Sequence, residues 1–140
     1  MAVTRKTLAL THDGAMKMLA AGIEKATEIG QPQCIVIVDA SGETLAQLRM
    51  TGAKFISLKS ARTKARTAAS NRAPSALVPE SFRTPIAFAT QGEVTGIGGG
   101  LPIIIDDEVI GGVGIGSGSA DQDMAVANAA LVAIGAQTFE

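Results

Sequence analysis

The chain has 140 residues, a net charge of −1 and neither tryptophan nor tyrosine, and these values exclude several classes of protein. Nucleic-acid binding is not expected, because affinity for phosphates needs a clustered positive charge. No membrane span is expected, since no apolar run reaches the roughly 20 residues that a span needs. One cysteine and one histidine cannot form a zinc site of the usual Cys/His type, so no metal site is predicted.

The length, and the absence of repeats or linkers, predict one domain over residues 1–140. The N-terminal segment lacks the apolar core of a secretory signal, because Thr11, His12 and Asp13 interrupt it. We therefore expect a cytoplasmic protein. The single cysteine, Cys34, precedes an apolar run and is expected to be a small buried side chain.

The first half of the chain shows helical periodicity, then a strand pattern, then helical periodicity again. Apolar residues recur at helical spacing after Thr11, which can cap a helix that ends before Gly30. Two apolar runs, 34–38 and 44–50, flank a turn and predict a β-hairpin. Residues 55–72 then return to the helical period.

The predicted helix over residues 55–72 carries the candidate positive charges. Lys59, Arg62 and Arg66 are three and four residues apart, so they form one basic ridge. Lys64 lies on the opposite border of the apolar stripe, where a lysine is partly desolvated and can contact a pocket.

The middle of the chain is punctuated by prolines. We expect one short helical turn between residues 73 and 91, because proline lacks a backbone donor and disfavours helix before it. Residues 92–97 are a candidate short strand, and the runs 101–105 and 109–115 predict a second hairpin.

The last predicted helix is apolar on every side. Asp121 or Asp123 is expected to cap it, and residues 124–136 are apolar or glycine except for Asn128. A helix without a solvent face must be covered on more than one side. We expect another subunit to provide this cover.

Two glycine-dense segments, 96–100 and 111–118, bracket the second hairpin. A phosphate-binding loop is excluded because no lysine or arginine follows Arg83, and the dinucleotide fingerprint fails at its sixth position, which is Leu101 or Ser119. The glycines are interpreted as positions of close approach. Residues 116–120 lie between a strand and a helix, where free N–H groups favour an anion or simply form a turn.

Short motifs follow one another along nearly the whole chain: Asp39–Gly42, Arg49–Ala53, Lys64–Ala68, Gly99–Ile103, and Gly111–Ser117 followed by Gln122–Asp123. Together they resemble the GlcG/HbpS-like family, also called the haem-degrading or PduO C-terminal-like family. The resemblance implies an α/β (α+β) fold with a single five-stranded antiparallel sheet flanked by helices, assembled into oligomers. It also implies binding of haem or a corrinoid-related group in some members. The chain departs from the family at Thr51, where an aspartate is frequent.

We expect an oligomeric protein that binds a small anionic or carboxylate-bearing ligand, with haem or a related tetrapyrrole as the candidate that the resemblance implies. The expected ligand-binding residues are cationic side chains and the donors of the glycine loops, namely Arg49, Arg62, Lys64, Gly98, Gly99, Gly100 and Ser117.

Two alternatives remain open from the residues. One is an enzyme of small-acid or aromatic catabolism acting on an unsaturated ring-cleavage acid, by hydrolysis, dehalogenation or tautomerisation. Lys64 or His12 would then be the acid/base group, and the glycine loops would stabilise negative charge. The other is a non-catalytic accessory subunit whose apolar last helix is the functional surface.

Overall fold

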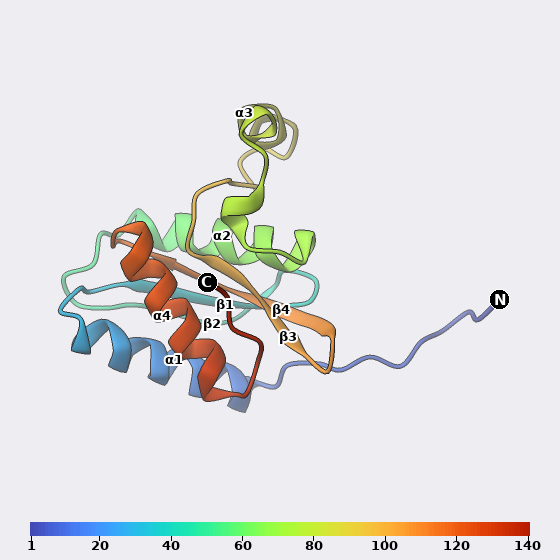
Figure 1. Ribbon diagram of the computed structural model, residues 1–140, viewed down its shortest axis with the longest axis horizontal. Coiled ribbons are helices and arrows are strands. Elements are labelled where there is room, and N and C mark those ends of the chain that lie inside the picture. Colours follow the sequence, from blue (N-terminus) through green and yellow to red (C-terminus); the bar gives the residue numbers. More distant parts are fainter.

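The computed structural model describes residues 1–140, in which one antiparallel sheet lies between helices on its two faces (Figure 1). The strands follow the order β2-β1-β4-β3. They span Thr44–Arg49 for β2, Cys34–Asp39 for β1, Glu108–Gly116 for β4 and Gly100–Ile105 for β3. The helices are α1 (His12–Glu28), α2 (Ser57–Asn71), the short 3-10 turn η1 (Ser75–Leu77), α3 (Glu80–Ala89) and α4 (Ala120–Ala133).

The alternation of side chains along β1 divides the interior into two cores. Ile35 and Ile37 pack with residues of α1 and α4, whereas Val36 and Val38 pack against α2. All four are fully buried, and each contributes about 1.5–3 kcal/mol relative to an exposed position. Cys34 lies on the α2 side and is also buried, as predicted.

Glycines of β4 allow α2 to lie directly on the sheet. A Cβ atom at Gly112 would overlap the carbonyl oxygen of Ala65, and one at Gly114 would overlap that of Ala61. The interpretation of this glycine segment as a region of close approach agrees with these positions. The approach is made by the chain's own helix.

The sheet has four strands, and the expected fifth strand over residues 92–97 is absent. Two backbone N–H groups that could pair with a neighbouring strand donate instead to side-chain hydroxyl groups. Val94 donates to the hydroxyl of Thr90, and Thr95 donates to that of Thr67. The segment is therefore anchored by side chains instead of a neighbouring strand.

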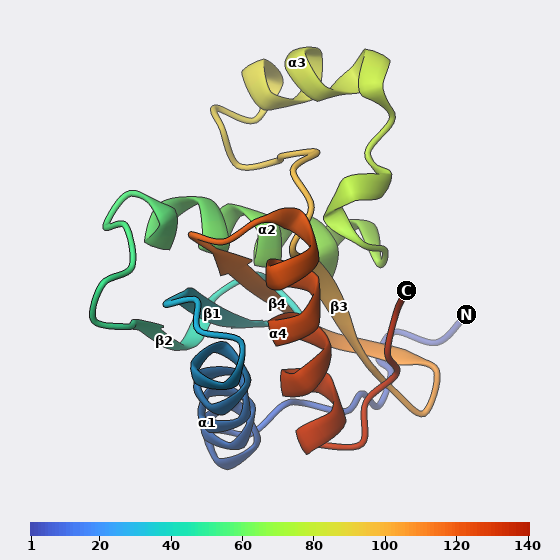
Figure 2. The same ribbon diagram turned by 60° about the vertical axis from the view of Figure 1, so that its left-hand side comes forward.

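The proline-rich segment also differs from its prediction. Residues 80–89 form the ten-residue helix α3, which begins after Pro79 and continues through Pro85. The prolines were interpreted as breaks, yet Pro79 occupies the N-cap, where its missing N–H is not needed. No residue of α3 is buried, and the helix stands away from the sheet and its covering helices (Figure 2). We call residues 75–97 the arm.

The caps of the two outer helices are formed by hydroxyl groups. Thr11 caps α1 as predicted, because its side chain accepts a hydrogen bond from the Gly14 amide. The prediction for α4 was wrong: Ser119 caps it, in a capping box with Gln122. Asp123 does not cap the helix, because its carboxylate is directed toward a buried lysine.

α4 packs on α1 and the sheet along one side only. Its residues Val126, Ala127, Ala130 and Leu131 are fully buried in that interface. Val132 on the outer side is 65% exposed. None of the helices is both long and apolar enough to cross a membrane.

Candidate functional site

A groove of about 760 Å³ lies between the base of the arm and the N-terminal half of α4. Its lining is largely apolar or glycine, with Pro74, Leu77, Gly98, Met124 and Phe139 among its members. Its charged side chains are acidic, Asp121 and Glu140, and no lysine or arginine lines it. The size is within the range of about 300–1,000 Å³ typical of small-molecule sites.

The glycines Gly98, Gly99 and Gly100 form one wall of the groove. Gly99 has a φ of +112°, and a Cβ there would come within 2.9 Å of the Ile115 carbonyl oxygen and 3.2 Å of the Lys64 ammonium nitrogen. A Cβ at Gly100 would overlap the backbone carbonyl of Lys64. The glycines therefore let the groove wall lie directly on α2 and on the end of β4.

Lys64 and Asp123 form a buried ion pair behind this wall. The ammonium of Lys64 donates to Asp123 at 3.0 Å and to the Ile115 carbonyl at 2.7 Å. The two side chains are only 5% and 4% exposed. The pair connects α2 to the first turn of α4 and neutralises the charge of Lys64, so the lysine is buried more completely than the helical pattern predicted.

A buried amide that the sequence did not point to completes this polar cluster. Gln33 is fully buried, and neither polar atom of its side chain has a hydrogen-bond partner. A Cβ at Gly118 would come within 2.5 Å of the Gln33 side-chain nitrogen and 2.8 Å of an Asp123 carboxylate oxygen. Gln33 directly precedes an apolar strand, and nothing in its sequence context indicates that its side chain is buried beside Asp123.

Asn128 holds the other wall of the groove. Its side chain donates to the Phe139 carbonyl at 2.7 Å and accepts from the Phe139 amide at 2.9 Å. The C-terminal segment is thereby fixed beside α4, with Phe139 at the groove. This contact explains the single polar residue in the otherwise apolar stretch of the last helix.

Arg49 and Ser117 lie outside the groove. Arg49 is exposed on β2, at the opposite edge of the sheet from β3. It pairs in register with Cys34, whose thiol pKa is raised by burial although the charge of Arg49 opposes that shift. The Ser117 hydroxyl accepts from the Lys54 amide at 3.0 Å, so it joins a loop to the end of β4.

The other predicted residues are also separate. Arg62 is half-buried on α2 and does not line the groove. Arg66 of the same ridge pairs with Glu93 at 2.8 Å. His12 begins α1, is 84% exposed, and lies a helix length of about 25 Å from the end of α1 that leads into β1. Of the predicted site residues, the structure therefore brings Gly98, Gly99, Gly100 and Lys64 together at the groove wall. His12 is not among the residues that line the groove.

Comparisons with known proteins agree with this fold. The corrinoid adenosyltransferase PduO of Citrobacter freundii is 31% identical over 99% of the chain. The chain spans 43% of the length of that relative. Protein ORFY of Klebsiella pneumoniae has a crystal structure that is 31% identical and superposes with a TM-score of 0.91, covering 98% of both chains.

A second solved structure is a complex of PduOC with haem. It is 30% identical, has a TM-score of 0.86, and the match covers 95% of this chain and 100% of PduOC. The family model described as haem degrading protein HbpS-like matches residues 10–132. That match spans the four-stranded sheet, the arm and all but the last residue of α4. The chain therefore belongs to the HbpS-like family.

Proposed function

We propose that the protein binds a flat, largely apolar ligand that carries carboxylates, with haem or a related tetrapyrrole as the leading candidate, in the groove beside Gly98–Gly100. The observation that carries the proposal is the groove itself. It combines a volume of about 760 Å³ with a glycine wall and an apolar lining. Similarity to a protein crystallised with haem supports the same ligand class.

The lining residues fit the macrocycle of haem, because glycine and apolar side chains suit a flat ring. Met124 also lines the groove, and methionine is one of the residue types that can be an axial ligand of haem iron. Haem, when bound, would supply an iron centre for redox or ligand-binding chemistry. Asp121 and Glu140 disfavour carboxylates inside the groove, so those of the ligand are expected at its rim.

The geometry does not favour acid/base catalysis by Lys64 and His12. The Lys64 ammonium is held by Asp123 and by the carbonyl of Ile115. His12 is exposed at the start of α1. No proton donor and acceptor pair is therefore assembled by these two residues at the groove.

Titration with haemin tests the proposal. We expect a saturable Soret shift with the wild-type protein, and at least a tenfold weaker affinity after Gly98→Leu, because a leucine side chain would fill the groove. The substitution is suitable since Gly98 has no positive φ, and an added Cβ would meet only the Ala76 Cβ, at 3.6 Å. Ala20→Leu on the exposed face of α1 is the matched control.

Met124→Leu separates sulfur ligation from shape. It preserves the apolar volume but removes the thioether, so the haemin spectrum should change while the stoichiometry is retained. A response that never saturates, or equal affinities for wild type and Gly98→Leu, would contradict binding in this groove.

We also propose that the protein acts as a homo-oligomer. The arm and the outer side of α4 expose large apolar side chains, each at least 60% exposed: Leu77, Phe82, Phe88, Ile97 and Val132. α3 has no buried residue, and a helix of ten residues is marginal in water without packing. A second copy of the chain would cover surfaces that one copy leaves open.

A further inference from the structure

Arg83 extends from α3 along the base of the arm, close to the groove. Its Nε donates to the Val78 carbonyl at 3.0 Å, and its Nη2 donates to the Ala76 carbonyl at 3.1 Å. Ala76 and the neighbouring Leu77 line the groove. The two hydrogen bonds therefore hold the guanidinium against the backbone of a segment that includes two residues of the groove lining.

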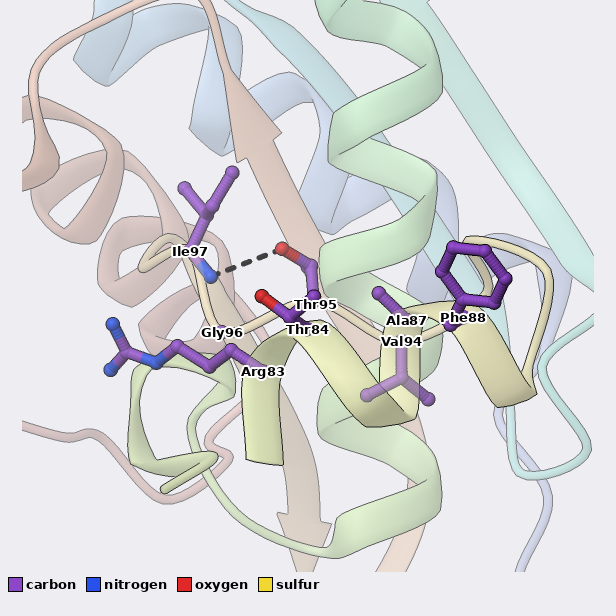
Figure 3. A pocket seen from close by; sticks show the side chains of 8 residues that line it. All are labelled: Arg83, Thr84, Ala87, Phe88, Val94, Thr95, Gly96 and Ile97. Atoms are coloured by element: carbon purple, nitrogen blue, oxygen red, sulfur yellow. Dashed lines mark hydrogen bonds between the residues drawn. The ribbon is translucent and has the colours of Figure 1, made fainter. Parts of the chain in front are cut away.

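Gly96 provides the space in which the stem of Arg83 lies. A Cβ at Gly96 would come within 2.5 Å of the Arg83 Cδ and 2.6 Å of its Cγ. Figure 3 shows both residues in the lining of a separate pocket of about 430 Å³, with the guanidinium of Arg83 directed away from Phe88. The first glycine of the segment 96–100 thus accommodates an arginine, whereas the last three form the groove wall.

The charge of Arg83 is not neutralised within the chain. Arg83 takes part in none of the ion pairs of the structure, and its Nη1 makes no hydrogen bond. Lys64, the other cation in contact with the groove wall, is paired with Asp123. Of Lys64 and Arg83, only Arg83 therefore keeps an unpaired charge and a free donor, at Nη1, for a ligand.

We propose that Arg83 binds a carboxylate of the ligand at the rim of the groove, and that Gly96 positions it for this contact. The inference rests on the proposed binding of a carboxylate-bearing ligand in that groove. Arginine suits the task because its planar fork pairs with a carboxylate and keeps its charge at all physiological pH values. The carboxylate would thus lie outside the acidic and apolar part of the groove.

Haemin and its dimethyl ester distinguish this contact from binding of the macrocycle, because the ester lacks the charge that Arg83 would meet. Wild type should bind haemin at least tenfold more tightly than the ester, a difference of about 1.4 kcal/mol. Arg83→Gln should lose that preference and keep the affinity for the ester. Lys17→Gln, which removes an exposed charge on α1, should behave as wild type.

Each outcome has a distinct meaning. Equal affinities of wild type for haemin and the ester, or an undiminished preference in Arg83→Gln, would overturn the assignment while leaving the proposed function intact. An equal loss of affinity for both ligands in Arg83→Gln would assign the arginine a structural role only. Failure of wild type to bind either ligand would overturn both proposals.

Gly96→Ala provides a second test that keeps the charge. The added methyl group would displace the arginine stem, so the preference for haemin over the ester should fall as in Arg83→Gln. Circular dichroism of both variants should match wild type. An unchanged preference in Gly96→Ala would contradict the positioning role of this glycine.

Discussion

At the scale of single residues, Lys64 has the sequence position expected of a ligand-binding residue, but its ammonium group is held by other groups of the protein. Its position beside an apolar stripe agrees with a pocket contact, and it does lie behind the groove wall at Gly99. However, both of its hydrogen bonds are to groups within the protein. Its clearest role is to join α2 to α4 beneath the groove.

We predict that Asp123→Ala lowers the free energy of unfolding by about 3–5 kcal/mol, because it leaves the Lys64 ammonium buried without a counter-charge. Urea denaturation monitored by circular dichroism measures this change. The double variant Lys64→Met, Asp123→Leu should recover most of the loss, since apolar residues of similar volume need no counter-charge. A loss below about 1 kcal/mol in Asp123→Ala would contradict the importance of the pair.

At the scale of elements, the N-terminal segment before α1 is attached to Glu108, the first residue of β4. The Glu108 carboxylate accepts from the Thr7 hydroxyl and, at 2.7 Å, from the Leu8 amide. The hydrogen bond from Thr7 is the main cause that lowers the pKa of Glu108 from its ordinary value of 4.5. The ionised carboxylate is therefore the form that holds the segment.

This attachment should depend on pH. Since the pKa is lower when the segment is attached, the stabilisation is complete above pH 4.5 and is lost as the pH falls through the lower pKa of the attached state. Hydrogen exchange of the Leu8 amide, followed by NMR, should show reduced protection in that acid range. Glu108→Gln keeps an acceptor oxygen but cannot titrate, so its exchange should lack this transition; an identical transition in the variant would assign it to another group.

At the scale of the whole molecule, α3 is the helix that one chain leaves without buried residues (Figure 2). Phe82 is 60% and Phe88 86% exposed, although aromatic side chains contribute most when buried. Val132 on the outer side of α4 adds a further exposed apolar side chain. A second copy would cover these side chains without any change in the fold of the first.

We therefore expect the wild-type protein to be larger than its monomer mass of 14.2 kDa when sized by light scattering at micromolar concentration. The double variant Phe82→Ser, Phe88→Ser should shift the distribution toward monomers and retain the helical signal of the body. Met16→Ser, at a 55% exposed apolar position on α1, is the control. A monomeric wild type would contradict the proposal, and an unchanged assembly in the double variant would exclude the arm as its interface.

Local patterns in the sequence were sufficient for most of the elements. The helical period after Thr11, the apolar run at Cys34 and the hairpin around residues 106–107 all depend on neighbours in sequence, and the structure confirms them. The resemblance to the family is likewise carried by ordered motifs, and the family match over residues 10–132 confirms it. The glycine segments were correctly interpreted as close approaches, because no other residue suits repeated contact with backbone.

Only the tertiary structure determined which groups meet. Lys64 and Asp123 are 59 residues apart, and their pairing depends on how α2 and α4 cross the same end of the sheet. The absent fifth strand likewise depends on a hydrogen bond from Thr95 to Thr67 of α2, and the Arg83–Gly96 contact on how α3 packs on the segment that follows it. Periodicity reports which face of an element is buried, but not which distant side chain lies opposite, because packing of whole elements sets those distances.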